Sequence, residues 1–322
     1  MTDEQRGDET MRTIRFRSYG EPMDVLRLEE AAVPSPGAGQ IRVRVHACGL
    51  NPADWALCRG LFATDLPRGV GLDVSGTVDA VGEAVADVRI GDRVLGPANY
   101  MDYPSAGASE YAILKFWTPV PEGLDLIEAA TLPMAVETAY RSIDMLGVTA
   151  EHTLMVYGAG TMMGIAGVQM ALLRGARVIA AAGDTFAEEL RAMGAEVTPY
   201  GDGMVERVLE ICGGAPDLIF DAGPIGGVLP DLVRIAGGDA QRVLTISNHG
   251  PAAEALGVRN SFSALRYDAL ADFAKLAAEG RFKVPIARTF AFEDWREAVE
   301  LSVSGHAHGK LVLLPSGAAS NQ

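Results

Sequence analysis

The stretch from Leu154 to Gln169 constrains the fold of this chain more than any other. It reads LMVYGAGTMMGIAGVQ, which is an apolar run, a turn with Gly158 and Gly160, and the first turns of a helix. A strand that runs through glycines into a helix directs free backbone N–H groups and a helix N-terminus at one point, which suits a pyrophosphate. A second apolar run from Ala176 to Ala182 completes a predicted β-α-β unit. The stretch therefore predicts a dinucleotide-binding site.

The spacing of the glycines in this turn is irregular. A regular G-x-G-x-x-G motif would place its third glycine at Met163, whereas the chain has it one residue later, at Gly164. These glycines still permit a tight turn and a close approach of the backbone to a phosphate. The predicted cofactor-binding residues of the turn are Gly158, Ala159, Gly160, Thr161, Met162, Met163 and Gly164. The alternative is a strand-to-helix turn that packs tightly and binds nothing.

Gly164 carries a specific expectation for mutagenesis. It is expected where the helix and strand pack most closely and where the pyrophosphate meets the helix N-terminus. The change Gly164→Val is predicted to weaken cofactor binding at least about tenfold and to leave the fold largely intact.

The length and the charge of the chain limit its class and its partners. With 322 residues it is long enough for two domains, and 48% apolar with 21% charged residues is typical of globular proteins. No apolar run approaches the roughly 20 residues of a membrane span. The formal charge of −15 disfavours binding to nucleic acid and to anionic lipid. We expect a soluble protein with a small-molecule substrate, and neither nucleic acid nor membrane as a partner.

The cysteines and the N-terminus indicate the compartment. Cys48, Cys58 and Cys212 are odd in number and form no C-x-x-C pair, so they predict neither a disulfide framework nor a thiolate zinc site. A reducing cytoplasm fits this usage. Residues 1–10 are polar and mainly acidic, lack the features of a signal peptide, and are predicted to be a disordered extension.

Two patterns of hydrophobicity divide the rest of the chain. Residues 40–47 alternate apolar and charged side chains, as half-buried antiparallel strands do, and short strands are also predicted at 13–16, 26–28, 76–81 and 92–95. Near residue 128 the composition shifts to helix formers, and from Thr153 onward strands alternate with helices, which predicts a doubly wound parallel sheet and an α/β fold class. The predicted strands of this region cover 154–157, 176–182, 196–198, 217–221 and 242–246, and the predicted helices cover 135–146, 187–193, 204–211 and 267–278. A strand at 286–290 begins a shorter pattern that is expected to rejoin the first domain.

A series of motifs, taken in order, resembles one enzyme superfamily. The motifs are Tyr19–Pro22, Gly49–Trp55, Gly71–Val78, Gly91–Val94, Ser109–Ala112, Ala129–Pro133 and His308–Leu313. The chain resembles the medium-chain dehydrogenase/reductase superfamily, specifically its zinc-independent quinone oxidoreductase and enoyl reductase branch. The resemblance implies a GroES-like, β-rich catalytic domain of residues 11–128 and 284–315, a Rossmann domain of residues 129–283, NAD(P)H held between them, and a homodimer.

The resemblance also predicts that no metal takes part. In zinc alcohol dehydrogenases of this superfamily a cysteine ligand stands at the position of Asn51 and a histidine ligand at that of Leu72. An amide and an isobutyl group cannot replace thiolate and imidazole on zinc. His306 and His308 have a spacing that could clamp a metal, but two histidines near the C-terminus are more often surface or packing residues.

Three residues are the candidates for catalysis. Asn51 is predicted to donate a hydrogen bond to developing oxyanion charge on the substrate, with bracing of the nicotinamide ribose or capping of its loop as alternatives. Asp54 is a candidate for shuttling protons, and its alternative role, which is the favoured one, is to hold this loop through backbone hydrogen bonds. Tyr100 lies with Asn99 and Tyr103 in a loop that the resemblance places near the substrate, where these side chains either shape binding or cover the core.

One departure from the family pattern bears on the substrate. Enoyl-thioester reductases that resemble this branch carry a proton-donating tyrosine just after a glycine, and the matching segment here ends in Phe62. Phenylalanine has no proton to give, so we expect a quinone or a small enone or enal, whose product takes its proton from solvent. The alternatives are a trans-acting enoyl reductase of a biosynthetic pathway and a catalytically inactive dinucleotide-binding sensor.

The end of the second Rossmann strand indicates which nicotinamide cofactor is used. An acidic residue there would bind the ribose diol of NADH and repel a 2′-phosphate, and Ala181, Ala182 and Gly183 leave that place without one. Tyr200 matches a tyrosine beside the adenosine 2′-phosphate in NADPH-dependent relatives, so NADPH is predicted; Asp184 keeps NADH as the alternative. Further predicted cofactor-binding residues at strand ends are Gly183, Tyr200, Ala222, Thr245 and Ser247, with plain sheet packing as their alternative role.

Overall fold

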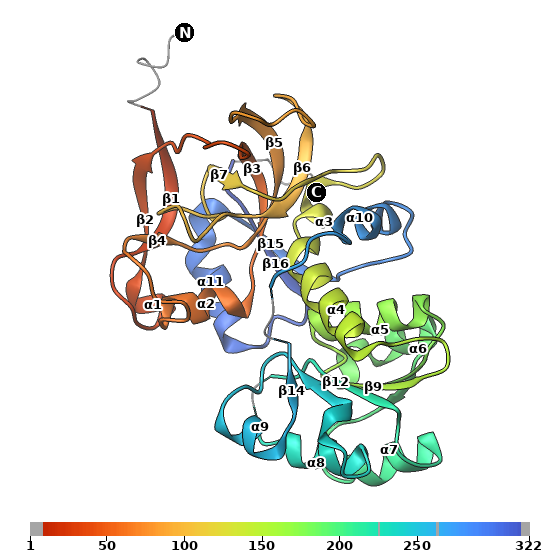
Figure 1. Cartoon of the computed structure of the whole chain (residues 1–322). Helices are drawn as coiled ribbons and strands as arrows, with labels where there is room; N and C mark the ends of the chain where they lie inside the picture. Colours follow the sequence, from red (N-terminus) through yellow and green to blue (C-terminus); the bar gives the residue numbers. More distant parts are fainter. Residues whose placement is uncertain (1–8, 225, 262–263, 317–322) are drawn as a thin grey trace. The chain divides into compact units, whose positions relative to one another are not determined.

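The computed structural model describes residues 9–224, 226–261 and 264–316, which form two compact units (Figure 1). The first unit comprises the chain up to Met134 and again from Leu270, and the second runs from Ala135 to Ala269. The sequence pattern had assigned residues 129–134 and 270–283 to the second domain, whereas their contacts lie within the first unit. Of the predicted extension, residues 1–8 lie outside the described part of the chain, and Thr10 already begins a strand.

The first unit is rich in short antiparallel strands. A three-stranded sheet has the order β2-β1-β4, and a seven-stranded sheet has the order β15-β16-β3-β5-β6-β8, with β7 also paired to β3. The strands are β1 (Thr10–Phe16), β2 (Leu26–Ala32), β3 (Ile41–Gly49), β4 (Arg68–Gly69), β5 (Asp73–Val81), β6 (Arg93–Pro97), β7 (Tyr111–Leu114), β8 (Thr118–Pro119), β15 (Ile286–Ala291) and β16 (Lys310–Leu314). The helices are α1 (Pro22–Val25), α2 (Pro52–Cys58), α3 (Leu126–Ala129), the start of α4 (Leu132–Leu146), α10 (Leu270–Ala278) and α11 (Trp295–Ser304).

Strand β3 shows why the alternating pattern predicted this arrangement. Val43 and Val45 are fully buried in the core of the unit, and Arg44 between them is exposed. Successive side chains of a strand point to opposite faces, so one face packs and the other meets solvent. The C-terminal segment rejoins this sheet, because β16 pairs antiparallel with β3 through Val312 and Leu313.

The second unit holds the parallel sheet that the sequence predicted. Its strand order is β11-β10-β9-β12-β13-β14, and every neighbouring pair is parallel. The strand numbers fall to β9 on one side and rise from β12 on the other, so the order of the strands reverses between β9 and β12. The strands are β9 (Thr153–Tyr157), β10 (Arg177–Ala181), β11 (Glu196–Thr198), β12 (Leu218–Asp221), β13 (Val243–Thr245) and β14 (Arg259–Asn260). The helices are α4, α5 (Met162–Leu173), α6 (Ala187–Met193), α7 (Met204–Cys212), α8 (Leu229–Ile235) and α9 (Pro251–Leu256). Ligands of such sheets bind at the carboxyl ends of the strands where the order reverses.

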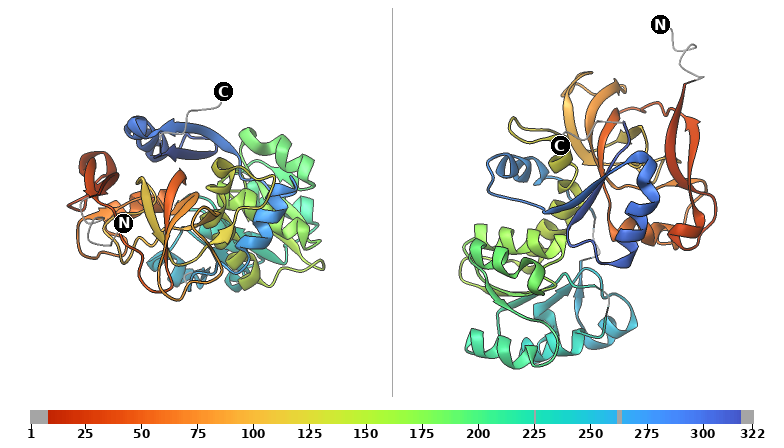
Figure 2. Two further views of the ribbon diagram at one scale, coloured as in Figure 1. Left: turned by 90° about the horizontal axis from the view of Figure 1, so that it is seen from above. Right: turned by 180° about the vertical axis from the view of Figure 1, so that it is seen from behind.

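Helices cover both faces of this sheet (Figures 1 and 2). Helix α5 packs on one face, where Gly167 lies against the ring of Phe220. Helices α7, α8 and α9 supply buried residues to the core on the other face, around Met155 and Ile219. The alternation of side chains along each strand explains why strands with two covered faces are almost wholly apolar.

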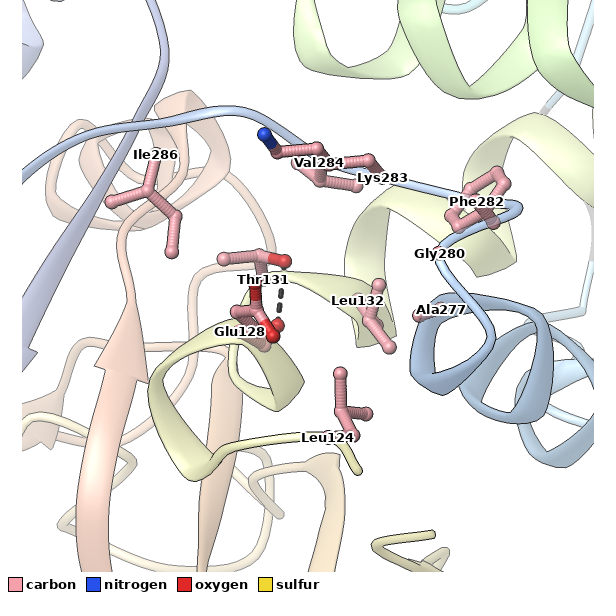
Figure 3. Close-up of a pocket in the computed structure, with 10 residues that line it drawn as sticks. All are labelled: Leu124, Glu128, Thr131, Leu132, Ala277, Gly280, Phe282, Lys283, Val284 and Ile286. Carbon is pink, nitrogen blue, oxygen red and sulfur yellow. Dashed lines mark hydrogen bonds between the residues drawn. The ribbon is translucent and has the colours of Figure 1, made fainter. Parts of the chain in front are cut away.

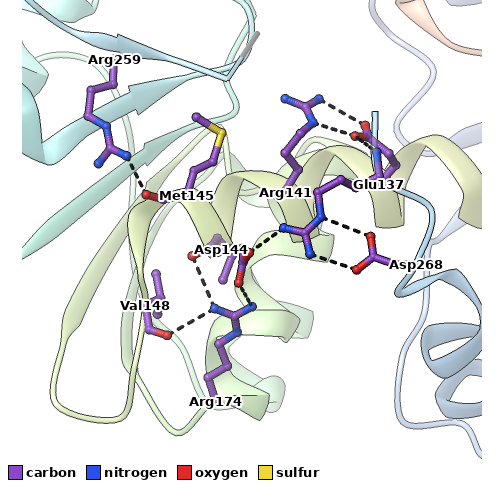
Figure 4. Close-up of polar contacts among 10 residues, drawn as sticks. Glu137, Arg141, Asp144, Met145, Val148, Arg174, Arg259 and Asp268 are labelled. Carbon is purple, nitrogen blue, oxygen red and sulfur yellow. Dashed lines mark hydrogen bonds and ion pairs between the residues drawn. The ribbon is translucent and has the colours of Figure 1, made fainter. Parts of the chain in front are cut away.

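A polar network fixes the last segment of the second unit to α4 (Figure 4). The carboxylate of Glu137 is fully buried and pairs with Arg141 at 2.6 Å, and Arg141 also donates to the carbonyl oxygen of Ser261. Arg266 pairs with Asp144 at 2.6 Å and with Asp268 at 2.9 Å. These contacts tie the described residues that follow β14 to α4.

None of the helices in the described ranges is both long and apolar enough to cross a membrane.

Candidate functional site

The glycine turn of the second unit is capped by a threonine. Helix α5 begins at Met162, and the side chain of Thr161 accepts a hydrogen bond from the backbone N–H of Gly164 at 3.0 Å. The same hydroxyl donates to the carbonyl oxygen of Ala222 at 3.0 Å, just beyond the end of β12. Thr161 is therefore an N-cap that also ties the turn to the neighbouring strand, which accounts for the irregular glycine spacing.

The three motif glycines meet different surroundings. A Cβ atom on Gly164 would lie 2.2 Å from the carbonyl oxygen of Gly158, and one on Gly158, whose φ is +69°, would lie 2.3 Å from Cα of Gly223. At both positions backbone atoms of the protein leave no room for a side chain. A Cβ atom on Gly160 would meet nothing nearer than 3.7 Å, in the ring of Phe186. The fold does not need a glycine at position 160, so the open space there fits a ligand that approaches the backbone.

The first turn of α5 supplies N–H groups beside that space. The first N–H groups of a helix have no acceptor within the helix, and at this end they belong to Met162, Met163 and Gly164. Gly164 is satisfied by Thr161, and the N–H of Ala159 donates to the carbonyl oxygen of Ala181 at 3.1 Å. Met162 and Met163 are therefore the residues of the turn whose backbone suits a pyrophosphate.

A buried carboxylate organises the ends of β12 and β13. Asp221 accepts hydrogen bonds from Thr245 Oγ1 at 2.7 Å, from Asn248 Nδ2 at 2.8 Å and from the N–H of Gly223 at 3.1 Å. Burial raises the pKa of Asp221, and these donors oppose the rise. Ser247 donates to the carbonyl oxygen of Gly223. In this geometry Thr245 and Ser247 hold the strand ends in place, and Asn248, which sequence reasoning missed, belongs to the same network.

The end of β10 lies beneath a tyrosine. A Cβ atom on Gly183 would lie 3.4 Å from the ring of Tyr200, which is 56% exposed. Arg207 anchors the segment that carries this ring, because its guanidinium donates to Thr198 Oγ1 at 3.2 Å and to the carbonyl oxygen of Pro199 at 2.8 Å. Asp184 is exposed at the start of a short 3₁₀ helix. The structure thus brings Gly183 and Tyr200 together.

In the first unit Asn51 belongs to a buried polar cluster. Lys310 Nζ donates to Asn51 Oδ1 at 2.6 Å and to Asp73 Oδ2 at 2.7 Å, and all three residues are at most 2% exposed. Asn51 Nδ2 donates to Asp73 Oδ2 at 2.9 Å and to the carbonyl oxygen of Gly49 at 3.3 Å. The second oxygen of Asp73 accepts from the N–H of Met134 at 2.8 Å. An ammonium group can only donate, so the amide oxygen of Asn51 must face Lys310.

This cluster changes the role open to Asn51. Both of its amide hydrogens are already donated within the chain, so none is free for the oxygen of a substrate. The predicted donor role is therefore replaced by a structural one, in which Asn51 and Asp73 neutralise and orient Lys310. Sequence reasoning missed Lys310 and Asp73. The signal for Lys310 was a lysine that opens the apolar run Leu311–Leu314.

Asp54 makes the backbone hydrogen bonds of its alternative role. Its two oxygens accept from the N–H of Asn51 at 2.8 Å and from the N–H of Gly71 at 2.7 Å. The side chain is fully buried, and this burial raises its pKa to about 7 even though both hydrogen bonds lower it. Asp54 therefore fixes the loop between β3 and α2 to the chain that precedes β5.

Tyr100 is half-buried in the loop after β6. Its pKa is raised by burial, lowered by Arg68 and raised by Asp54, so these three residues share one electrostatic neighbourhood. Its two neighbours in the loop serve the fold instead, because Tyr103 donates to Gln40 Oε1 at 2.6 Å and Asn99 donates to Asp102. Of the three polar residues in this loop, Tyr100 is the one whose hydroxyl is left for a substrate.

The two positions at which the resemblance implies zinc ligands hold Asn51, which is bound to Lys310, and Leu72. Leu72 is 4% exposed and packs in the core of the first unit. The nearby thiol of Cys48 is fully buried, which raises its pKa well above its ordinary value. In the described part of the chain no group of three or more His, Cys, Asp or Glu side chains is arranged to hold a metal ion, and this includes His306 and His308.

A pocket of about 360 Å³ lies in the first unit between α3 and the segment after α10 (Figure 3). Its wall is mainly apolar, with Leu132 and Phe282 among its residues, and it also includes Glu128 and Lys283. Thr131 Oγ1 donates to the carbonyl oxygen of Glu128 at 2.7 Å and so closes the turn before α4. None of the predicted catalytic residues lines this pocket.

Two family models match parts of this chain. Residues 37–121 match the family model of the alcohol dehydrogenase GroES-like domain, and residues 193–313 match the model named zinc-binding dehydrogenase. The second range includes neither Asn51 nor Leu72.

Individual relatives and a solved structure are similar over different lengths. Human quinone oxidoreductase is 34% identical over 183 residues, which are 55% of this chain and 54% of the relative. The 2-methylene-furan-3-one reductase of Solanum lycopersicum is 33% identical over 201 residues, which are 58% and 51% of the two chains. The chain thus spans about half the length of these relatives. The structure of the quinone oxidoreductase from Coxiella burnetii has a TM-score of 0.80 at 25% identity and covers 95% of this chain and 99% of that one.

These matches confirm the predicted fold class, a GroES-like domain combined with a Rossmann-type parallel sheet. The family consists of oxidoreductases and implies a nicotinamide dinucleotide cofactor. The open space above Gly160 and the N–H groups of Met162 and Met163, which have no acceptor among the described residues, fit that cofactor's pyrophosphate. The chain therefore belongs to the medium-chain dehydrogenase/reductase superfamily, in its quinone oxidoreductase branch.

Proposed function

We propose that this protein is an NADPH-dependent reductase of quinones or small α,β-unsaturated carbonyl compounds, and that it works without zinc. The observation that carries the proposal is the turn before α5, where Gly160 leaves open space beside unpaired helix N–H groups. The similarity to human quinone oxidoreductase and to the tomato 2-methylene-furan-3-one reductase supports the substrate class.

The buried cluster in the first unit supports chemistry without a metal. The oxygen of Asn51 already accepts from Lys310, and Leu72 offers no lone pair. A zinc ion would need three protein ligands in a catalytic site, and thiolates or imidazoles are its usual ones.

The surroundings of Gly183 support NADPH over NADH. Strand β10 ends at Ala181, and the next two residues, Ala182 and Gly183, carry no carboxylate. The first carboxylate after the strand is that of Asp184. Tyr200 offers its ring and hydroxyl at this position, and the guanidinium of Arg207 is bound to the residues directly before it. A cation near the adenosine ribose favours a 2′-phosphate.

When bound at the turn before α5, NADPH would supply the hydride that reduces the conjugated carbonyl compound, and solvent would supply the one proton that completes the reduction. The protein's own residues position the reactants and donate a hydrogen bond to the substrate oxygen. The pKa of Tyr100 is raised by burial, so its hydroxyl keeps its proton at neutral pH and is the donor we assign to the developing charge on the substrate oxygen.

The test combines binding with turnover. NADPH and NADH are titrated by the fluorescence of the bound nicotinamide, and NADPH oxidation is then followed with quinones, enones, enals and enoyl thioesters. Tighter binding of NADPH and turnover of the first three classes support the proposal. Turnover of enoyl thioesters alone supports the enoyl reductase alternative, and binding without any turnover supports the sensor alternative. Failure to bind either cofactor overturns the reductase.

A further inference from the structure

Arg68 is a buried cation that the reaction described above does not use. It lies in β4, is 2% exposed and is among the largest fully buried side chains of the chain. Its Nη1 donates to the carbonyl oxygen of Phe62 at 2.7 Å. Its Nη2 makes two long contacts, 3.4 Å to the carbonyl oxygen of Tyr100 and 3.6 Å to Sδ of Met101.

The charge of Arg68 is not matched by an acid. Among the described residues no carboxylate forms an ion pair with this guanidinium, whereas Arg15, Arg42 and Arg141, which are buried to a similar degree, each have one. The Nε–H of Arg68 has no hydrogen-bond partner at all in the described part of the chain. Burying an unpaired charge costs several kcal/mol, so such a group is retained where something else compensates it.

The two edges of the guanidinium are used differently. The Nη1 side is bound at short distance to Phe62, whose φ of 53° lies in the left-handed region, and so it serves the fold. The opposite edge consists of Nε and Nη2, with one unpartnered N–H and two long contacts. Two parallel N–H groups on one edge of an arginine are the geometry that binds a carboxylate through both of its oxygens.

We propose that Arg68 binds a carboxylate group of the substrate through its Nε–Nη2 edge, so that the preferred substrates are conjugated carbonyl compounds that also carry a carboxylate. The inference rests on the proposed function. Arg68 shares an electrostatic neighbourhood with Tyr100 and Asp54, which are two of the three predicted catalytic residues. Its ring contact with Tyr100, 5.7 Å from the guanidinium carbon to the ring centroid, brings the charge next to the proposed hydroxyl donor.

Phe62 and Met101, which contact Arg68, lie in exposed segments. Residues 61–65 are all exposed, and Phe62 and Met101 are each 47% exposed although they are apolar. Apolar side chains left in solvent around a buried cation suit a ligand with an apolar body and a charged end. The long contacts of Nη2 are the ones that an entering carboxylate would replace.

The charge count selects a carboxylate over a phosphate. Arg68 offers one positive charge, and the two N–H groups on its open edge match the two oxygens of one carboxylate. A phosphate monoester carries nearly two negative charges at neutral pH and is usually bound by several donors. The net charge of −15 makes a second negative charge still less favourable.

The experiment compares two substrates with the same reacting bond. The parent protein is assayed with NADPH and either 4-oxopent-2-enoate or its methyl ester, and the ratio of their kcat/KM values is measured. The expected ratio is at least about tenfold in favour of the carboxylate. It is expected to fall to near one in Arg68→Met and to a value between that and the parent's in Arg68→Lys, which keeps the charge and loses the paired edge. Arg59→Met is the matched control, because Arg59 is an exposed arginine paired with Glu21, and its ratio should equal that of the parent.

A binding measurement separates this inference from the proposed function. The saturated carboxylate 4-oxopentanoate is expected to raise the unfolding temperature of the parent and not that of Arg68→Lys. If the parent reduces neither compound but shows this shift, the carboxylate site stands and the reductase proposal fails. Equal kcat/KM values for acid and ester in the parent overturn the inference. A ratio of kcat/KM values that is unchanged in Arg68→Lys also overturns the inference. In that case Arg68 would have only a structural role, binding the segments of Phe62 and Tyr100.

Discussion

Lys310 and Asn51, 259 residues apart in the chain, meet in the core of the first unit with Nζ 2.6 Å from Oδ1. The same ammonium pairs with Asp73 at 2.7 Å, and neither partner of this ion pair is more than 2% exposed. A buried ion pair is neutral as a whole, but each partner depends on the other because removal of one leaves an uncompensated charge. The cluster thus makes the loop at Asn51 and the C-terminal strand depend on each other.

The change Lys310→Met is expected to lower the free energy of unfolding by roughly 3–5 kcal/mol, because it leaves Asp73 charged and unpaired in the core. The measurement is denaturant unfolding of parent and variant. Lys115→Met is the control, since it removes an exposed lysine paired with Asp102 and should cost no more than about 1 kcal/mol. Equal effects of the two changes would show that the Lys310 pair contributes no more than a surface pair.

The glycine turn gives a matched pair of changes. Gly164→Ala is expected to destabilise the fold by roughly 1–3 kcal/mol, because its Cβ atom would lie 2.2 Å from the carbonyl oxygen of Gly158. The expectation that Gly164→Val leaves the fold largely intact is therefore revised. Gly160→Ala has room for its Cβ atom and is expected to keep the parent's unfolding temperature while it weakens NADPH binding. Thermal unfolding and fluorescence titration of both variants test this split, and a reversed pattern would contradict it.

The raised pKa of Asp54 predicts that the stability of the fold depends on pH in an unusual way. Its pKa in the folded protein is about 7, whereas an unfolded aspartate has a pKa of about 4. Between these values the folded chain keeps a proton that the unfolded chain releases, so stability falls as the pH rises through this window. The contribution is complete below about pH 4, is lost above about pH 7, and amounts to at most roughly 4 kcal/mol.

The measurement for Asp54 is the difference between two unfolding curves. Other carboxylates titrate in the same range, so the parent is compared with Asp54→Asn at each pH from 4 to 8. The asparagine has one acceptor oxygen for the two N–H groups and is expected to lower stability most at pH 4, with the gap narrowing toward pH 8. A gap that stays constant with pH would contradict the raised pKa.

Removal of metal ions is expected to change nothing. After dialysis against a chelator, the unfolding temperature, NADPH binding and reductase activity should equal those of the untreated protein, because Asn51 is bound to Lys310 and Leu72 cannot ligate. Elemental analysis of the purified protein accompanies the assay. Stoichiometric zinc that leaves together with activity would contradict the metal-free mechanism.

Local sequence patterns determined much of the second unit. The apolar run, the glycines and the helix of residues 154–169 predicted β9 and α5 closely, and β11 (Glu196–Thr198) was predicted to the residue. These elements are specified by neighbours in the chain, through alternation, helix periodicity and the turn preference of glycine. The prediction was less accurate where ends depend on packing: α10 begins at Leu270 rather than at residue 267, and α11 (Trp295–Ser304) was not predicted.

The polar contacts of the site could not be read from such patterns. Thr161 stands in the glycine motif, but only the sheet places the carbonyl oxygen of Ala222 against its hydroxyl. Likewise, the sequence by itself determined that Asn51 and Leu72 stand where the resemblance implies zinc ligands. The tertiary structure decided that Lys310 binds the amide oxygen of Asn51 and that Arg68 is buried without an ion-pair partner among the described residues. The physical reason is that burial and hydrogen-bond satisfaction depend on groups from distant segments, and no local rule specifies which of them will meet.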